Sequence, residues 1–230
     1  MITLDDYLAN VDKDNTYHVL EVLKDTSYSR IEKITQKSQI FIRKYYHRND
    51  LPNDHKSSHE LTVLSRLHHI FMPRIEDIYE LPDKTVLIEE YVEGVSVLDD
   101  VRQREKLPAS EAVCLTLQLC EIVAFLHAQN PPIIHRDIKP DNIICTRTQT
   151  PTGTRTGIKL IDFSIARSYN PQKDKDTVFM GTVGYAPPEQ YGFGQTDMRS
   201  DIYAIGKTLL CTIAESGFSR SKAIEARPSE

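Results

Sequence analysis

The residues of this chain whose types and spacing could do chemistry gather in its second half. The run His135-Arg-Asp-Ile-Lys-Pro-Asp-Asn142 combines carboxylates, an amide and a lysine, and Asp162-Phe-Ser164 follows it after a short interval. Carboxylate and amide oxygens suit Mg²⁺, and a lysine can neutralise the charge of an anion such as a phosphate. Either segment alone would be commonplace, because a short tripeptide arises often by chance and Asp162 could simply end a strand.

Three further segments follow in order. They are Gly181-Thr-Val-Gly-Tyr185, Pro187-Pro-Glu189 and Asp201-Ile-Tyr-Ala-Ile-Gly206. A chance origin for all the segments in this order is negligible, so they are best interpreted together.

The elements that must position these residues begin with strands. The β-like runs are Tyr17–Leu23, Ile31–Thr35 and Gln39–Tyr46, followed by a hairpin of Arg74–Glu80 with Thr85–Tyr91. Apolar residues at three-residue spacing predict one helix over His55–His68. The first half is therefore expected to be a sheet with one helix.

The second half is predicted to be mainly helical. One helix is expected to begin with Ser110 as its N-cap. Its apolar stripe would consist of Val113, Leu117, Cys120, Ala124 and Phe125. The Thr- and Gly-rich insert Thr146–Gly157 is predicted to be an exposed loop, and Ile202–Ile213 an apolar helix.

Composition narrows the class of protein. The 230 residues carry a formal net charge of −5, which argues against a nucleic-acid binder that relies on bulk positive charge. No apolar run approaches the roughly 20 residues of a membrane span, and the N-terminus has no signal-peptide core. The four cysteines are Cys114, Cys120, Cys145 and Cys211. They form no CxxC pair and are expected to be buried free thiols in a reducing compartment, which predicts a cytoplasmic protein.

Together the motifs resemble those of the eukaryotic-like Ser/Thr protein kinases of bacteria, over about residues 15–214. In that family they form the catalytic loop, the magnesium motif, the substrate-positioning loop and the helix that follows. The resemblance implies an α+β, two-lobed protein-kinase-like fold with ATP bound in the cleft between the lobes. Residues 1–92 would form an antiparallel β N-lobe with one key helix, and residues 93–230 a mainly helical C-lobe.

The resemblance also implies a role for each matching residue. Asp137 would accept the proton of the substrate hydroxyl or orient that hydroxyl, and Lys139 would place a cation beside the γ-phosphate. Asn142 and Asp162 would bind Mg²⁺, which needs few protein oxygens because phosphates and water complete its shell. His135 is expected to be structural, holding the loop in place.

Three residues relate to the activation segment, which is the stretch between Asp162-Phe-Ser164 and Pro187. Arg136 suggests a pocket for a phosphate group on that segment. Thr177 is the best phosphate acceptor within it. Thr182 is instead expected to make a structural contact with Asp137 and Lys139.

The nucleotide loop departs from the family pattern. The matching stretch, Lys24–Ile31, contains no glycine, so its backbone would cover ATP less tightly. The resemblance still implies that Leu23 and Ile31 contact the nucleotide. The backbone groups of Glu90 and Val92 would bond to the adenine.

The residue that grips the α- and β-phosphates is open between Arg43 and Lys44, whose side chains point to opposite faces of one strand. The less bulky neighbour Ile42 favours Lys44, and the resemblance gives Glu60 as its ion-pair partner. Glu89 falls at the gatekeeper position, which is usually apolar. Its carboxylate must therefore be paired, be protonated or reach water.

The end of the chain also departs from the family, because only about 16 mostly polar residues follow Ala214. This predicts a C-lobe that lacks its last helices and a poorly ordered tail, Glu215–Glu230. The helix Ile202–Ile213 would then expose apolar surface, and Glu189 would lose its usual arginine partner. A regulatory partner that completes the C-lobe is one arrangement that fits this pattern.

The sequence predicts an ATP- and Mg²⁺-dependent kinase that phosphorylates Ser or Thr hydroxyls of proteins, itself included, without nucleic acid or membrane. A pseudokinase or regulatory nucleotide-binding module stays open, because the loop lacks glycines and Glu89 is unusual. Asp137 and Asp162 argue against it, since a pure scaffold has no physical need for them. A small-molecule phosphotransferase also stays open, although Gly181–Glu189 is typical of a platform for protein substrates.

Overall fold

The computed structural model describes residues 4–26, 29–47, 64, 67–150, 153–172, 181–192 and 194–213. Of the helix predicted over His55–His68, only residues 64, 67 and 68 lie among them. Glu60, Thr177 and the tail Glu215–Glu230 lie outside the described residues. The chain divides into two compact units, Met1–Val92 and Glu93–Glu230.

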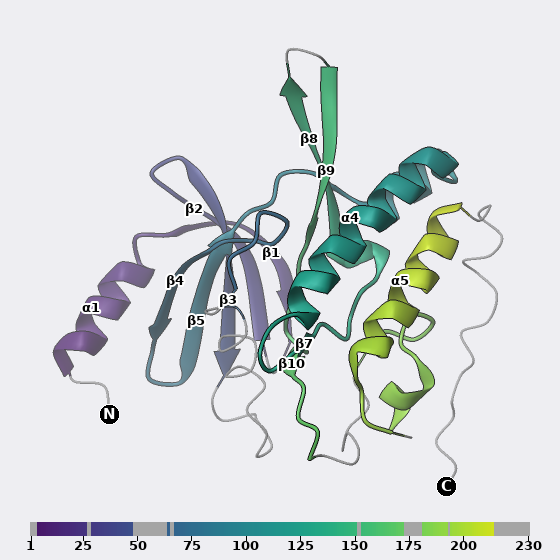
Figure 1. The fold of residues 1–230 in the computed structure, drawn as a ribbon. Helices are drawn as coiled ribbons and strands as arrows, with labels where there is room; N and C mark the ends of the chain where they lie inside the picture. Colours follow the sequence, from purple (N-terminus) through teal and green to yellow (C-terminus); the bar gives the residue numbers. More distant parts are fainter. Residues whose placement is uncertain are drawn as a thin grey trace, which may run out of the picture. The chain divides into compact units, whose positions relative to one another are not determined.

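The first unit is built on a five-stranded antiparallel sheet with the strand order β1-β2-β3-β5-β4 (Figure 1). The strands are β1 (His18–Asp25), β2 (Ser29–Gln36), β3 (Gln39–His47), β4 (Ile75–Glu80) and β5 (Lys84–Glu90), and helix α1 (Leu4–Asp14) precedes them. The predicted strands and the hairpin of β4 with β5 are confirmed. The helix α1 was not predicted.

The strand register assigns neighbouring residues of β3 to opposite faces of the sheet. Lys44 lies opposite Ile31 on β2 and Leu87 on β5, so these three side chains share one face. Arg43 lies opposite Glu32 on β2 and points to the other face. That second face carries an apolar cluster of Ile34, Tyr45, Tyr79, Leu81, Val86 and Ile88, against which Val11 of α1 packs.

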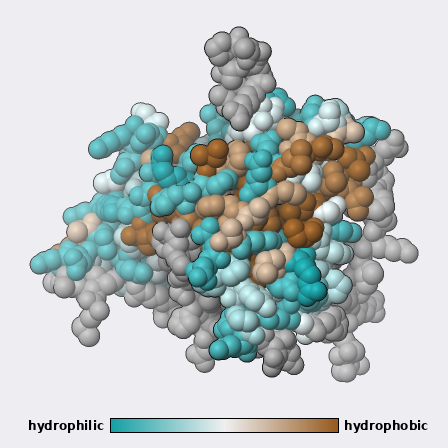
Figure 2. Space-filling view, viewed as in Figure 1, coloured by the Kyte–Doolittle hydropathy of each residue, from teal (hydrophilic) through white to brown (hydrophobic). Residues whose placement is uncertain are grey.

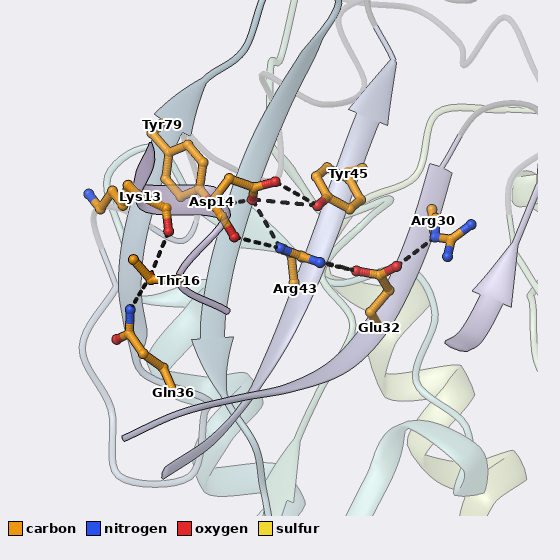
Figure 3. Close-up of polar contacts among 9 residues, drawn as sticks. All are labelled: Lys13, Asp14, Thr16, Arg30, Glu32, Gln36, Arg43, Tyr45 and Tyr79. Carbon is orange, nitrogen blue, oxygen red and sulfur yellow. Dashed lines mark hydrogen bonds and ion pairs between the residues drawn. The ribbon is translucent and has the colours of Figure 1, made fainter. Parts of the chain in front are cut away.

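Asp14, the last residue of α1, ties the helix to the face of the sheet that carries Arg43 (Figure 3). Its carboxylate accepts hydrogen bonds from the hydroxyls of Tyr79 at 2.5 Å and Tyr45 at 3.1 Å. The same carboxylate pairs with Arg43 Nη1 at 3.1 Å, and Arg43 Nη2 pairs with Glu32 at 2.6 Å. Burial, and then the bond to Asp14, raises the pKa of Tyr79, so its hydroxyl stays a donor.

The second unit combines two long helices with a β-hairpin (Figure 1). Helices α4 (Ala109–His127) and α5 (Met198–Ile213) pack against each other, and α4 also contacts β9. The hairpin strands are β8 (Ile143–Thr150) and β9 (Gly153–Leu160). The shorter elements are β6 (Val95–Ser96), α3 (Val97–Arg104), β7 (Ile133–Ile134), β10 (Arg167–Ser168) and the 3₁₀ helices η1 (Pro140–Asn142) and η2 (Pro188–Tyr191). The helix predicted over Ile202–Ile213 is confirmed as part of α5.

Helix α4 buries a different face from the predicted one. Its buried residues are Ala112, Leu115, Leu119, Ile122, Val123 and Leu126. Val113 and Leu117 of the predicted stripe are exposed, as are Cys114 and Cys120, so the expectation of four buried thiols was wrong. The helix is apolar on both faces, and periodicity alone therefore could not select the buried one.

Two further expectations about α4 need correction. Ser110 is not its N-cap, because the helix begins at Ala109 after Pro108 and no side chain caps it. By length and composition alone, α4 is apolar enough to cross a membrane, contrary to the expectation that no run in the chain is. Its contacts with α5 and β9 account for only part of this apolar composition, because 33% of its apolar window is buried.

The described residues of the insert, 146–150 and 153–157, form strands instead of the predicted loop. β8 and β9 pair antiparallel from Ile143 opposite Leu160 to Thr150 opposite Gly153. Its threonines recur at every second position, and this residue type and spacing favour an extended strand. The Gly and Pro content of the insert favours a loop, but the alternation of threonines at every second position favours strands, and strands are what form.

Apolar side chains gather on the surface over α4 and α5 (Figure 2). Leu117 of α4 is 61% exposed, and α5 exposes Ile202, Tyr203, Leu210 and Ile213. The prediction that the helix Ile202–Ile213 would expose apolar surface is therefore confirmed.

We expect Asp14→Asn to lower the free energy of unfolding by about 2 kcal/mol, because a hydrogen bond to a charged acceptor contributes about 1.5–3 kcal/mol. Urea unfolding of the full chain, followed by circular dichroism, measures this loss. The matched control is Asp12→Asn on the exposed side of α1, with an expected change below about 0.5 kcal/mol. Equal losses in the two variants would contradict an anchoring role for Asp14.

Candidate active site

The β8–β9 hairpin places the two predicted metal ligands side by side. Asn142 directly precedes β8, and Asp162 stands just beyond the end of β9. The N–H of Ile161 donates to the carbonyl of Asn142 at 2.9 Å, which continues the ladder past the hairpin by one bond. The hairpin thus brings together two residues that are distant in sequence.

The Asp137 carboxylate accepts hydrogen bonds from three side chains. Lys139 Nζ lies 2.9 Å and Asn142 Nδ2 lies 3.0 Å from Asp137 Oδ2, while Thr182 Oγ1 donates to Oδ1 at 2.7 Å. Lys139 Nζ also donates to Thr182 Oγ1 at 2.8 Å. The predicted structural contact of Thr182 with Asp137 and Lys139 is therefore confirmed. These bonds fix the direction of the carboxylate and keep a cation beside it.

Asp201 of α5 holds the loop that carries Asp137. Its fully buried carboxylate accepts hydrogen bonds from the backbone N–H groups of His135 at 3.0 Å and Arg136 at 2.9 Å. His127 Nε2 at the end of α4 lies 2.8 Å from the same carboxylate. Arg136 has a positive φ of 73°, which is uncommon for a residue other than glycine. The bonds to Asp201 stabilise this backbone conformation.

His135 fills the space beneath the loop. Its buried ring packs edge-on against Phe163, with the ring centroids 4.6 Å apart. Burial lowers the pKa of His135, so the ring is neutral near pH 7. The N–H of Asp137 donates to His135 Nδ1 at 3.3 Å. These contacts fit the structural role predicted for His135.

The segment after residue 180 packs against the same loop. Gln190 Nε2 donates to the carbonyl of Arg136 at 2.8 Å. Gly181 has a φ of +140°, and a Cβ added there would lie 2.9 Å from Ala186 Cβ, so this position favours glycine. Glu189, expected to lack its arginine partner, accepts a hydrogen bond from Ser200 Oγ at 2.9 Å.

In the first unit, Lys44 Nζ pairs with Glu89 Oε1 at 3.0 Å. Both residues are buried, with 5% and 6% of their surfaces exposed. Of the possibilities left open for the Glu89 carboxylate, the structure shows pairing. Arg43, the other candidate for gripping phosphates, is engaged by Glu32 and Asp14 on the opposite face of the sheet.

The other predicted nucleotide contacts lie on the same unit. Leu23 is exposed on the edge strand β1, and Ile31 lies on β2 opposite Lys44. The N–H of Glu90 donates to the carbonyl of Arg74 at 2.8 Å, so an adenine contact of Glu90 would use its carbonyl. Val92 is half-buried at the end of this unit. Their roles toward a nucleotide stay predictions.

Among the described residues, no group of three or more His, Cys, Asp and Glu side chains could hold a metal ion. The remaining candidates are the oxygens of Asn142 and Asp162. This small set fits Mg²⁺, which is usually bound through one or two protein ligands together with phosphates and water. Asp162 has a positive φ of 64°, a conformation of the kind that concentrates at functional sites.

Comparison with known proteins gives the same fold class. The family model described as "Protein kinase domain" matches residues 14–227. "Myosin light chain kinase 3" of Danio rerio is 30% identical over 204 residues, which cover 84% of this chain and 27% of that protein. The protein of the same name from Rattus norvegicus is 28% identical over 215 residues, covering 90% and 25%. The chain thus spans about a quarter of the length of these curated relatives.

We expect Asp201→Asn to lower the free energy of unfolding by about 3 kcal/mol, because its amide nitrogen would face a donor instead of accepting from it. Chemical unfolding of the full chain measures the loss. The control is Asp141→Asn, an exposed residue of the same loop, which should change the free energy of unfolding by less than about 0.5 kcal/mol. If Asp201→Asn were as stable as this control, Asp201 would not anchor the loop.

Proposed function

The chain belongs to the protein kinase family, and on that premise we propose that it is an ATP- and Mg²⁺-dependent kinase of Ser and Thr hydroxyls in proteins. The observation that carries the proposal is the set of hydrogen bonds that Lys139, Asn142 and Thr182 make to Asp137. They hold a carboxylate acceptor and a cation together, which is what phosphoryl transfer asks of a protein. A purely structural loop has no need for this combination.

In this proposal, ATP would supply the γ-phosphoryl group, and Asn142 and Asp162 would hold Mg²⁺, which would neutralise phosphate charge when bound. The substrate hydroxyl oxygen forms a bond to the γ-phosphorus as the bond to the ADP oxygen breaks. Asp137 orients that hydroxyl and accepts its proton. Lys139 stabilises the charge on the transferred group, and Lys44 grips the α- and β-phosphates.

The finer features of the proposal rest on the motif resemblance. The segment His135–Asn142 supports Ser/Thr specificity, and the wording of Gly181–Gly206 supports kinship with bacterial enzymes, whereas the relatives named above come from animals. We further propose protein substrates, the chain itself among them, a cytoplasmic location without nucleic-acid or membrane binding, and a regulatory partner for the helical unit.

One observation favours the alternative of a pseudokinase. In the loop without glycine, the N–H of Thr26 donates to the carbonyl of Ser29 at 2.9 Å, and the N–H of Ser29 donates to Thr26 Oγ1 at 3.1 Å. These N–H groups are used within the turn, whereas the glycine-rich loop of the family turns such groups toward phosphates. A regulatory module that binds nucleotide without transferring phosphate is therefore the second candidate.

The first experiment is intact-mass analysis of the purified chain after incubation with Mg-ATP. We expect the wild type to gain phosphoryl groups on Ser or Thr, and Asp137→Asn to lose transfer by about 100-fold or more because it removes the acceptor. Binding of Mg-ATP, measured by calorimetry, should be retained in the variant. Asp141→Asn is the control in the same loop and should transfer normally.

The two candidate functions give different results in this experiment. A folded wild type that binds Mg-ATP and gains no mass would support the pseudokinase. Transfer at the wild-type rate by Asp137→Asn would remove Asp137 from the proposed mechanism. Phosphate found on Tyr alone would contradict the proposed specificity.

A further inference from the structure

The pairing of Lys44 with Glu89 follows from the register of the sheet. Lys44 lies opposite Leu87, and Glu89 lies opposite Ile42, so Lys44 and Glu89 are diagonal neighbours on one face of β3 and β5. Lys44 Nζ and Glu89 Oε1 are 3.0 Å apart. Both residues belong to strands paired continuously from Phe41 to His47, so this neighbourhood is built into the sheet.

Burial makes this contact a strong constraint on the lysine. An ammonium and a carboxylate that are both almost fully buried lose hydration, and only close pairing offsets that loss. The lysine ammonium is therefore held where the Glu89 carboxylate is. An ammonium has three N–H donors, so a bond to Glu89 is compatible with bonds to phosphate oxygens.

The opposite face of the sheet has its own charge balance. Arg43 pairs there with Glu32 and Asp14. Because neighbouring side chains of β3 point to opposite faces of the sheet, the carboxylates of Glu32 and Asp14 lie on the other face from Lys44 and do not pair with it.

We propose that Glu89 is a positioning residue that holds Lys44 for the nucleotide phosphates from within the sheet. The inference rests on the proposed function and deepens it. The resemblance implies instead that a helix carrying Glu60 positions the lysine.

The test compares Glu89→Gln with Glu60→Gln in the full chain. Calorimetry gives the Kd for Mg-ATP, and steady-state phosphorylation gives kcat and KM. We expect Glu89→Gln to raise Kd and KM for ATP about tenfold, the scale of one hydrogen bond between charged groups. Glu60→Gln measures what the helix implied by the resemblance contributes to the same constants. Glu89→Asp keeps the charge and should recover most of the lost affinity.

A double-variant cycle separates positioning from a general structural effect. Adding Glu89→Gln to Lys44→Met should change Kd less than about twofold, because the carboxylate would have no lysine left to position. A structural role would lower affinity equally in both backgrounds. Circular dichroism verifies folding, and if Glu89→Gln does not fold, Glu89→Asp compared with Glu60→Asp gives the same contrast with a smaller expected rise, of about threefold.

Several results would overturn the inference. A large loss of affinity in Glu60→Gln together with normal affinity in Glu89→Gln would return the role to the helix. Tighter nucleotide binding by Glu89→Gln would show that Glu89 withholds the lysine. A wild type that binds no nucleotide overturns this inference and the proposed function together, whereas an active wild type insensitive to Glu89→Gln overturns this inference alone. A wild type that binds Mg-ATP without transfer defeats only the proposed function, because Kd still reports on Lys44.

Discussion

The buried carboxylate of Asp201 is the constraint on which the rest of the second unit depends. A charge with no solvent contact must be compensated locally, and here the compensation comes from two consecutive backbone N–H groups and from His127. The helix that carries Asp201 is thereby joined to the end of α4 and to the loop before Asp137. The same two bonds stabilise the positive φ of Arg136. The loop so held carries Asp137, whose carboxylate is then directed by its own bonds to Lys139, Asn142 and Thr182.

In the first unit, buried charges are also compensated locally, and there the compensation comes from ion pairs. The period of two along β3 sends Arg43 and Lys44 to opposite faces, and each finds its carboxylates on its own face. The Arg43 set joins the sheet to the N-terminal helix through Asp14 and so serves stability. The Lys44 pair lies on the face that holds Ile31 and Leu87, away from that helix, and is the set we assign to function.

Much of this could be predicted from sequence, because motif order and local periodicity are properties of the chain itself. The strands of the first unit and the helix from residue 202 followed from such patterns, and the contact of Thr182 with Asp137 followed from the resemblance to the kinase family. The buried face of α4 could not be predicted, because both of its faces are apolar and only packing against α5 and β9 selects one. The partner of Glu89 required the register between β3 and β5, and the role of Asp14 required contacts with Arg43 and Tyr79, all of which are tertiary information.

The missing glycines and the Lys44–Glu89 pair bear on the same physical requirement. A kinase must place positive charge near the nucleotide phosphates, and it can use backbone N–H dipoles in a loop or cations on rigid strands. Here the described part of the loop uses its N–H groups within its own turn, and Arg30 at its end is paired with Asp25 at 2.9 Å. Thr26, Ser29 and Arg30 thus direct these groups to partners within the chain, which leaves the exposed Lys24 as the remaining cation among the described loop residues. In the mechanism we propose, binding of the phosphates therefore depends more heavily on a lysine fixed by the sheet. A buried carboxylate at residue 89 would be unfavourable without a cation, and its pairing with Lys44 explains its presence.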